Sequence, residues 1–176
     1  GLGLCSFAVG VSPEEVKAKV DIYRQGIAAC REPLGVELHD EAATFTMALC
    51  AEDRDRAHAL ARDSFEWYPK TGARQIATVA DWMAEQQRDL GNYGYAADLR
   101  TIDDAGALDL LSLEYLVENG ACVLGTPADC IDACRRYEEA GVDLLLCLVN
   151  PWKVPHEAVM QTIELMGTEV IPAFKS

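Results

Sequence analysis

The sequence lacks several features that would each point to a particular class of protein. Half of its 176 residues are hydrophobic, yet no uninterrupted apolar stretch approaches the roughly 20 residues that span a bilayer. The first residues also lack the charged start and the cleavage site of a secretory signal peptide. We therefore expect no membrane partner and a location in the cytoplasm.

Basic residues are few and scattered. The chain holds 15 Lys and Arg against 29 Asp and Glu, which gives a formal net charge of -14. A protein that binds a phosphate backbone needs clustered Lys and Arg, because neutralising phosphates releases condensed counterions. A nucleic-acid partner is therefore not expected.

The seven cysteines do not form a recognisable pattern. Their number is odd and their surroundings are apolar, which argues against a disulfide framework and for a reducing compartment. Cys130 and Cys134 are one helical turn apart, but no second pair and no nearby histidine completes a four-ligand site, so no metal is expected. Walker, GxGxxG and Ser-His-Asp patterns are absent too, and the catalytic residues are therefore unknown.

Residues 121–150 predict a strand, a helix and a second strand. Thr126 suits the helix N-cap, Pro127 the first helical position, and Asp129 adds negative charge to the first turn. Gly141 suits the left-handed position that ends a helix. The run from Leu144 to Val149 is apolar without alternation, as expected of a strand covered on both faces. This stretch therefore predicts a parallel βαβ unit.

The same alternation extends along the chain. Ser12, Pro13 and Glu15 form a predicted capping box at the start of a helix that ends near Pro33. Strands are predicted at about 2–9, 43–50, 121–124 and 143–149, each followed by helical sequence, and the helix after the second strand is expected to end near Tyr68. The last helix is expected near 156–166.

The number of βα units, four, limits the possible architectures. A (β/α)8 barrel takes roughly 250 residues, so four units need roughly half of that. We treat residues 1–176 as a single domain, with the less regular segment at about 69–105 as a helical and loop insertion. The fold class is α/β, and half of a barrel is favoured over a doubly wound open sheet, which periodicity alone does not separate from it.

Four stretches, taken in order, resemble a known family. They are SPEEV followed by VDIYR, the run CAEDRDRAHALA, the unit GTPADCIDACRRYEEAGVDLLL, and the terminal IELMGTEVIPAF. Together they resemble the C-terminal half of the bacterial luciferase-like flavin monooxygenases, over most of positions 1–68 and 106–174.

The resemblance implies a (β/α)8 barrel that oxygenates a small organic substrate with reduced flavin (FMN) and O2, usually as a dimer. The alternative cofactor is a deazaflavin. Because the first four βα units of that family supply most flavin contacts and are absent here, the fragment alone is not expected to bind flavin fully. The chain begins on an apparent buried strand, and we expect an excised half that forms a homo-oligomer or pairs with an N-terminal half-barrel.

Candidate site residues follow from the barrel rule that loops after the strands form the site. Gly125 and Thr126 follow one strand, and they either bind a ligand or serve only as a helix cap. Asn150, Trp152 and Lys153 follow the last strand, where Trp152 could stack on a ring and Lys153 could meet an anion; a solvated loop with one packed Trp is the alternative.

Two further alternatives concern the whole chain. Tyr68, Lys70, Tyr93 and Tyr95 make the insertion either a lid over the site or a plain excursion. The chain itself is either part of a flavin enzyme or a catalytically silent half-barrel that serves as an interaction or structural domain, with apolar surfaces that need a partner.

Overall fold

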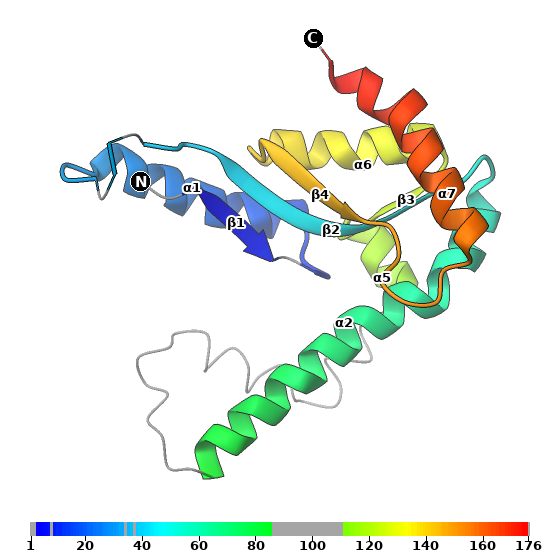
Figure 1. The fold of residues 1–176 in the computed structure, drawn as a ribbon, viewed down its shortest axis with the longest axis horizontal. Coiled ribbons are helices and arrows are strands. Elements are labelled where there is room, and N and C mark those ends of the chain that lie inside the picture. Colours follow the sequence, from blue (N-terminus) through cyan, green and yellow to red (C-terminus); the bar gives the residue numbers. More distant parts are fainter. Residues whose placement is uncertain (1–2, 8, 34, 37, 86–110, 176) are drawn as a thin grey trace.

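A computed structural model describes residues 3–7, 9–33, 35–36, 38–85 and 111–175. Its centre is a parallel sheet in which strand β2 (Ala42–Cys50) pairs with each of the other three strands (Figure 1). Strand β1 (Leu4–Phe7) pairs with the first part of β2, β4 (Leu144–Leu148) with residues 43–47, and β3 (Val123–Gly125) with residues 48–50. The predicted α/β class with a parallel sheet is confirmed.

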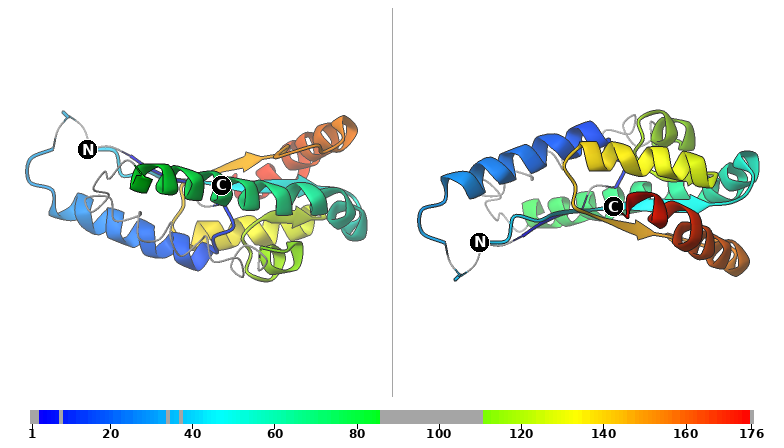
Figure 2. Two further views of the ribbon diagram at one scale, coloured as in Figure 1. Left: turned by 90° about the horizontal axis from the view of Figure 1, so that it is seen from below. Right: turned by 90° about the horizontal axis from the view of Figure 1, so that it is seen from above.

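Helical sequence follows the strands, as the alternation predicts. The bounds are α1 (Pro13–Ala29), α2 (Arg54–Glu85), α5 (Leu113–Glu118), α6 (Pro127–Glu139) and α7 (His156–Leu165), with a π turn η1 (Met166–Val170) and a 3-10 turn η2 (Ile171–Phe174) continuing α7. Helices α1 and α6 lie on the same side of the strands, and the C-terminal part of α2 extends away from the sheet (Figures 1 and 2). Within the described ranges, no helix is both long and apolar enough to cross a membrane.

The predicted capping box of α1 is present. The backbone N–H of Ser12 donates to Glu15 Oε2 at 3.0 Å, and the N–H of Glu15 donates to Ser12 Oγ at 3.3 Å. Two N–H groups that a helix start leaves without an internal partner are thereby satisfied.

Helix α2 is longer than the sequence predicts. The expected end near Tyr68 is wrong, because the helix continues through Pro69 to Glu85. Proline lacks an N–H donor and its ring crowds the preceding turn, which weakens a helix without always ending it. The Lys70 ammonium meets Glu66 Oε2 at 3.3 Å on the surface of this part of α2. Residues 69–85 of the predicted insertion are thus helical, and the part from 86 onwards lies outside the described residues.

Both faces of β2 are buried, against different partners. Met47, Leu49 and Ala51 belong to a core that α2 and α5 complete with Phe65 and Leu116 among others. The alternate residues Ala42, Ala48 and Cys50 belong to a second core formed with α1, α6 and the chain after α7. This alternation follows from the two-residue period of a strand.

Strand β4 differs from its prediction. The uninterrupted apolar run predicts cover on both faces, but Leu144 and Leu146 are 56% and 42% exposed. Their neighbours Leu145 and Cys147 pack against the second core. The expected double cover is therefore wrong for the first part of β4, where Leu144 and Leu146 are exposed, whereas Leu148 at its end packs against the first core.

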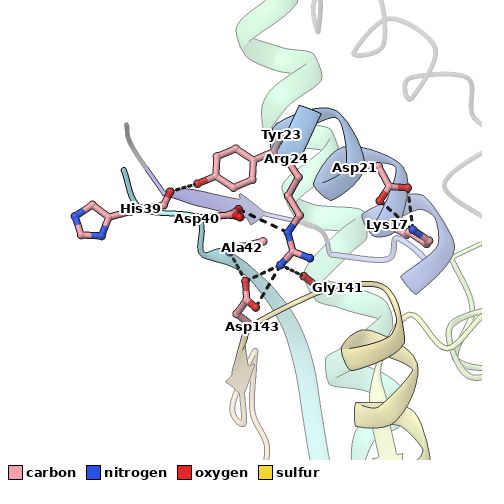
Figure 3. A network of polar contacts seen from close by, with 9 residues as sticks. All are labelled: Lys17, Asp21, Tyr23, Arg24, His39, Asp40, Ala42, Gly141 and Asp143. Atoms are coloured by element: carbon pink, nitrogen blue, oxygen red, sulfur yellow. Dashed lines mark hydrogen bonds and ion pairs between the residues drawn. The ribbon is translucent and has the colours of Figure 1, made fainter. Parts of the chain in front are cut away.

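A polar network fixes β4 beside β2 at the start of both strands (Figure 3). The N–H of Asp143 donates to the carbonyl of Ala42 at 2.8 Å, and the N–H of Ala42 donates to Asp143 Oδ2 at 2.8 Å. The Arg24 guanidinium reaches from α1 to the Asp143 carboxylate at 3.1 Å and to the carbonyl of Gly141 at 3.1 Å. Helix α1, the start of β2 and the turn before β4 are thereby joined.

The other end of β2 is fixed by Thr162 of α7. Its hydroxyl donates to the carbonyl of Cys50 at 3.2 Å and accepts the N–H of Cys50 at 3.1 Å, and the side chain is fully buried. The last residue of β2 therefore completes its backbone hydrogen bonding with a side chain from another element.

Thr162→Val should destabilise the fold by about 1–3 kcal/mol, because a buried N–H and a buried carbonyl lose their partner while the volume hardly changes. Urea unfolding followed by circular dichroism measures the loss. Thr162→Ser keeps the hydroxyl and should lose less than half as much; equal stability of wild type and Thr162→Val would contradict this role.

Candidate functional site

The candidate site residues lie after the strands, as the sequence predicts. Gly125 ends β3 and Thr126 precedes α6, while residues 150–153 connect β4 with α7. The first residue of α2, Arg54, lies after β2. The ends of β2, β3 and β4 therefore each contribute residues to the candidate site.

Gly125 and Thr126 form the start of α6. The N–H and the hydroxyl of Thr126 donate to Asp129 Oδ2 at 2.9 and 2.8 Å, and the N–H of Asp129 donates back to Thr126 Oγ1 at 3.4 Å. Gly125 has a φ of 134°, and a Cβ there would lie 2.5 Å from Asp129 Oδ2. Glycine is thus required both by the backbone and by the approach of the carboxylate.

Asp129 also binds Arg54, which sequence reasoning did not select. Both carboxylate oxygens accept from the Arg54 guanidinium, one of them from Nε at 3.0 Å. Arg54 holds the pKa of Asp129 far below its usual value, with help from Thr126. The Thr-x-x-Asp spacing was a visible signal for the cap, but no local pattern joins Arg54 to a residue 75 positions away.

Arg54 and Asp129 line a pocket of about 400 Å³ at β3. Its polar groups come from α2 (Arg54 and His58) and α6 (Asp129, Asp132 and Arg136), and Cys122 before β3 and Leu124 within it contribute apolar surface. Arg136 is itself bound to Glu14 at 3.0 Å and to the carbonyl of Asn119 at 3.3 Å. The pocket is thus mixed in charge, and two of its cations already have carboxylate partners.

The second group of predicted residues lies in the loop before α7. The side-chain oxygen of Asn150 accepts the N–H of Val154 at 3.3 Å, and the N–H of Trp152 donates to Ser64 Oγ of α2 at 3.1 Å. Lys153 has a φ of 49°, which is uncommon for a residue with a side chain. The loop is therefore held by its own polar contacts and by α2.

Trp152 is enclosed by two neighbours. Its ring stacks on Trp67 of α2 with centroids 4.8 Å apart and an angle of 13°, and Lys153 Nζ lies 4.3 Å from its ring centroid. Because the Trp67 ring covers one face of Trp152, the Lys153 ammonium lies over the opposite face. A ligand ring can stack on Trp152 only by displacing one of these two side chains.

The structure does not bring the two groups together. On α2, Arg54 contacts the first group through Asp129, and Ser64 contacts the second group at Trp152. Arg54 and Ser64 are ten residues apart in the sequence, which corresponds to about 15 Å along a helix axis. Gly125 and Thr126 thus lie near one end of α2, while Asn150, Trp152 and Lys153 lie near its middle. Whether any of the five binds a ligand stays a prediction.

The remaining candidates offer little chemistry. Tyr68 and Lys70 lie within α2, whereas Tyr93 and Tyr95 lie outside the described residues, so the predicted lid remains a prediction. All seven cysteines carry free thiols, and burial raises the pKa of Cys122 and Cys134 to about 12. Among the described residues, no three His, Cys, Asp or Glu side chains are placed to hold a metal ion.

Comparisons with known proteins give this arrangement a family context. Residues 1–144 match the sequence model of a family described as luciferase-like monooxygenase. No curated protein matches the chain. The monooxygenase RslO1 from Streptomyces bottropensis is 16% identical in sequence, and the superposition covers 99% of this chain and 42% of that one with a TM-score of 0.56.

Two further solved structures are similar in fold. The coenzyme F420-dependent tetrahydromethanopterin reductase from Methanopyrus kandleri is 20% identical, with a TM-score of 0.54 over 98% of this chain and 45% of that chain. The oxygenating constituent of 3,6-diketocamphane monooxygenase from Pseudomonas putida, in complex with FMN, is 20% identical, with a TM-score of 0.56 over 97% and 42%. The chain spans less than half the length of these barrels, which confirms the predicted partial barrel.

Trp67→Ala and Trp152→Ala should each destabilise the fold, and the double variant should lose less than the sum, with a coupling of about 0.5–1.5 kcal/mol for the stacked pair. Chemical unfolding of all four proteins gives the cycle. Trp82→Ala, which removes an exposed indole of the same helix, provides a control for tryptophan loss. Strict additivity of the first two would mean that the stack contributes nothing.

Asp129→Asn should lower the free energy of unfolding by about 1 kcal/mol at pH 7, since the exposed Arg54 partner limits the value of the ion pair. The folded pKa lies below that of an unfolded aspartate, so the contribution is present above about pH 4 and is lost as the pH falls further. Unfolding at pH 7 and pH 3 tests this. Asp132→Asn, which removes an exposed carboxylate of the same helix, is the control for the loss of one negative charge.

Proposed function

Because the chain belongs to the luciferase-like monooxygenase family, whose model matches residues 1–144, we propose that it is the C-terminal part of a flavin-dependent monooxygenase. The reaction is oxidation of a small organic substrate with reduced flavin and O2. The family match is the observation that carries the proposal, and the position of the candidate residues after consecutive strands supports it.

The flavin supplies the electrons for oxygen chemistry, and this chain contributes part of the surrounding wall. Lys153 is exposed, and its ammonium lies over the indole of Trp152. An anionic group of flavin or substrate can replace that indole as the partner of the ammonium. Asn150 and Trp152 hold the loop that carries it. Gly125 and Thr126 act through Asp129, which positions Arg54 beside the pocket.

The residues fit this cofactor only in part. The start of α6 is already occupied by the Asp129 carboxylate, and both faces of Trp152 are covered, so neither offers an immediate place for phosphate or ring. Lys153 and the β3 pocket are the parts of the described structure that fit an anion and an apolar group. The chain therefore provides a partial site, with further contacts from a partner.

The open face of β4 supports a partner. In a closed barrel the inward side chains of one half pack on those of the other, and Leu144 and Leu146 are exposed on this strand. An N-terminal half-barrel is the proposed occupant of this face, and a homo-oligomer is the alternative.

The free thiols agree with a cytoplasmic location.

FMN is the proposed cofactor and a deazaflavin the alternative. One similar structure is an FMN complex and another is a coenzyme F420-dependent reductase, and each name describes that protein alone.

A catalytically silent half-barrel is the second candidate function. The internal contacts that already engage Thr126, Asn150 and Trp152 favour it.

Titration of FMN with the purified chain tests the proposal. Saturable quenching of flavin fluorescence at micromolar protein is expected, and Lys153→Ala should weaken it at least threefold because an ammonium is lost from the anion contact. Lys17→Ala, which removes an exposed lysine of α1 paired with Asp21, should leave the affinity unchanged. A parallel titration with a deazaflavin distinguishes the two cofactors.

Absence of quenching with either compound at high micromolar protein would favour the silent domain. Equal weakening by both lysine substitutions would show that net charge, and not the loop before α7, controls binding.

A further inference from the structure

Two buried thiols lie together where strand β2 ends and helix α6 begins. Cys50 is the last residue of β2 and is 1% exposed, and Cys130 lies near the start of α6 and is fully buried. Both belong to the second core. Neither thiol has a part in the proposed function, and each is a nucleophile and a source of electrons.

Contacts with the backbone place the sulfur of Cys130 over Cys50. That sulfur lies 4.0 Å from the carbonyl oxygen of Leu49 and 4.0 Å from the carbonyl oxygen of Gly125. Leu49 precedes Cys50 in the chain, and Gly125 is the residue of β3 that is paired with Cys50. The Cys130 thiol also forms a hydrogen bond with the Cys50 sulfur. The two sulfurs are therefore direct neighbours.

The backbones of both cysteines are held by other residues. The N–H and the carbonyl of Cys50 are hydrogen-bonded to the Thr162 hydroxyl at 3.1 and 3.2 Å. The N–H of Cys130 donates to the carbonyl of Thr126 at 2.9 Å within α6. The two thiols, which are far apart in the sequence, are thus placed side by side by contacts that do not involve a disulfide.

We propose that Cys50 and Cys130 form a redox-active pair that hydrogen peroxide oxidises to a disulfide, which would join the end of β2 to the start of α6. Disulfides in a reducing compartment are usually transient and redox-sensing, so this bond is distinct from a structural framework. Reduced flavin that meets O2 without a substrate yields hydrogen peroxide, and the proposed function therefore provides a source of the oxidant. The pair itself needs no flavin, so the two proposals can fail separately.

Cys50 is the group that attacks the peroxide. The hydrogen bond from Cys130 lowers the pKa of the Cys50 thiol, although burial and the carboxylates of Glu169 and Asp129 act in the opposite direction. The same bond, together with burial, raises the pKa of Cys130. Because the thiolate is the reactive form of cysteine, Cys50 reacts first and Cys130 keeps its proton until the second step.

The reaction takes two steps. The Cys50 sulfur attacks one peroxide oxygen and the O–O bond breaks, so that hydroxide leaves and becomes water with the proton that Cys50 has lost. The Cys130 sulfur then attacks the Cys50 sulfenic acid and the S–O bond breaks, so that a second water leaves with the Cys130 proton. The two sulfurs lose two electrons in total, and the peroxide is reduced to two waters.

The other buried or partly buried thiols are less reactive. Burial raises the pKa of Cys122 and Cys134 to about 12 and that of Cys147 to about 11, so these thiols stay protonated. They therefore provide controls within the same chain.

The cover of the pair determines how an oxidant reaches it. Leu165 and Val170 of the C-terminal helical segment belong to the same core as Cys50 and Cys130. A segment at the end of a chain opens more readily than the centre of a sheet. Peroxide, which is little larger than water, therefore reaches the pair when this segment opens, without unfolding of the sheet.

Oxidation of the folded chain tests the proposal. Cys5→Ser and Cys30→Ser first remove the exposed thiols, which leaves five of the seven cysteines. The protein is treated with hydrogen peroxide at about 1 mM, catalase ends the reaction, and the remaining thiols are alkylated in urea. Mass spectrometry after trypsin cleavage should show peptide 32–54, which contains Cys50, joined to peptide 101–135, which contains Cys130. The number of alkylated thiols should fall by two.

Two further variants assign the bond, because peptide 101–135 also contains Cys122 and Cys134. Cys130→Ala should abolish the link and leave a Cys50 sulfenic acid that dimedone traps. Cys122→Ala removes another buried thiol of the same peptide and should leave the link unchanged. Far-UV circular dichroism checks that both variants fold.

Three results would overturn the proposal. They are an unchanged thiol count in the oxidised folded chain, a link that survives Cys130→Ala, and a link that forms only after the chain has been unfolded in urea.

Discussion

The Asp143 carboxylate is the interaction on which the arrangement of this sheet depends. Together with its own N–H it forms two hydrogen bonds to Ala42, and these place the start of β4 beside the start of β2. Arg24 of α1 holds the same carboxylate. In a closed barrel each strand pairs with its neighbours in the chain, whereas here β2 pairs with β1, β3 and β4. The sheet is thus organised around one strand, and Leu144 and Leu146 of β4 stay exposed.

Helix α2 divides the candidate site into two parts with different properties. At its first residue, Arg54 is bound to a carboxylate that also caps α6, so charge there is neutralised within the chain. Further along α2, Ser64 and Trp67 hold the loop before α7 through Trp152. Lys153 of that loop lies over the Trp152 ring and has no carboxylate contact among the described residues. The first part supports the fold around a pocket, and the second presents a positive charge to solvent. Any anionic ligand of this chain meets the second part more easily.

Local signals in the sequence predicted local structure well. The caps at Ser12 and Thr126 and the alternation of strands and helices depend on residues a few positions apart, and they are confirmed. Three features depend on distant residues and were not predictable in this way: the Thr162 contact with Cys50, the Trp67–Trp152 stack and the pairing of β4 with β2. Pro69 misled the prediction of α2 because proline weakens a helix without always ending it.

The Trp67–Trp152 pair has an optical consequence. Two indoles with centroids 4.8 Å apart lie close enough to couple their electronic transitions, so their near-UV signal depends on the relative position of the two rings. Since one indole belongs to a helix and the other to the loop before α7, that signal reports the position of the loop. The protein thus carries an intrinsic spectroscopic probe of that loop, which requires no label.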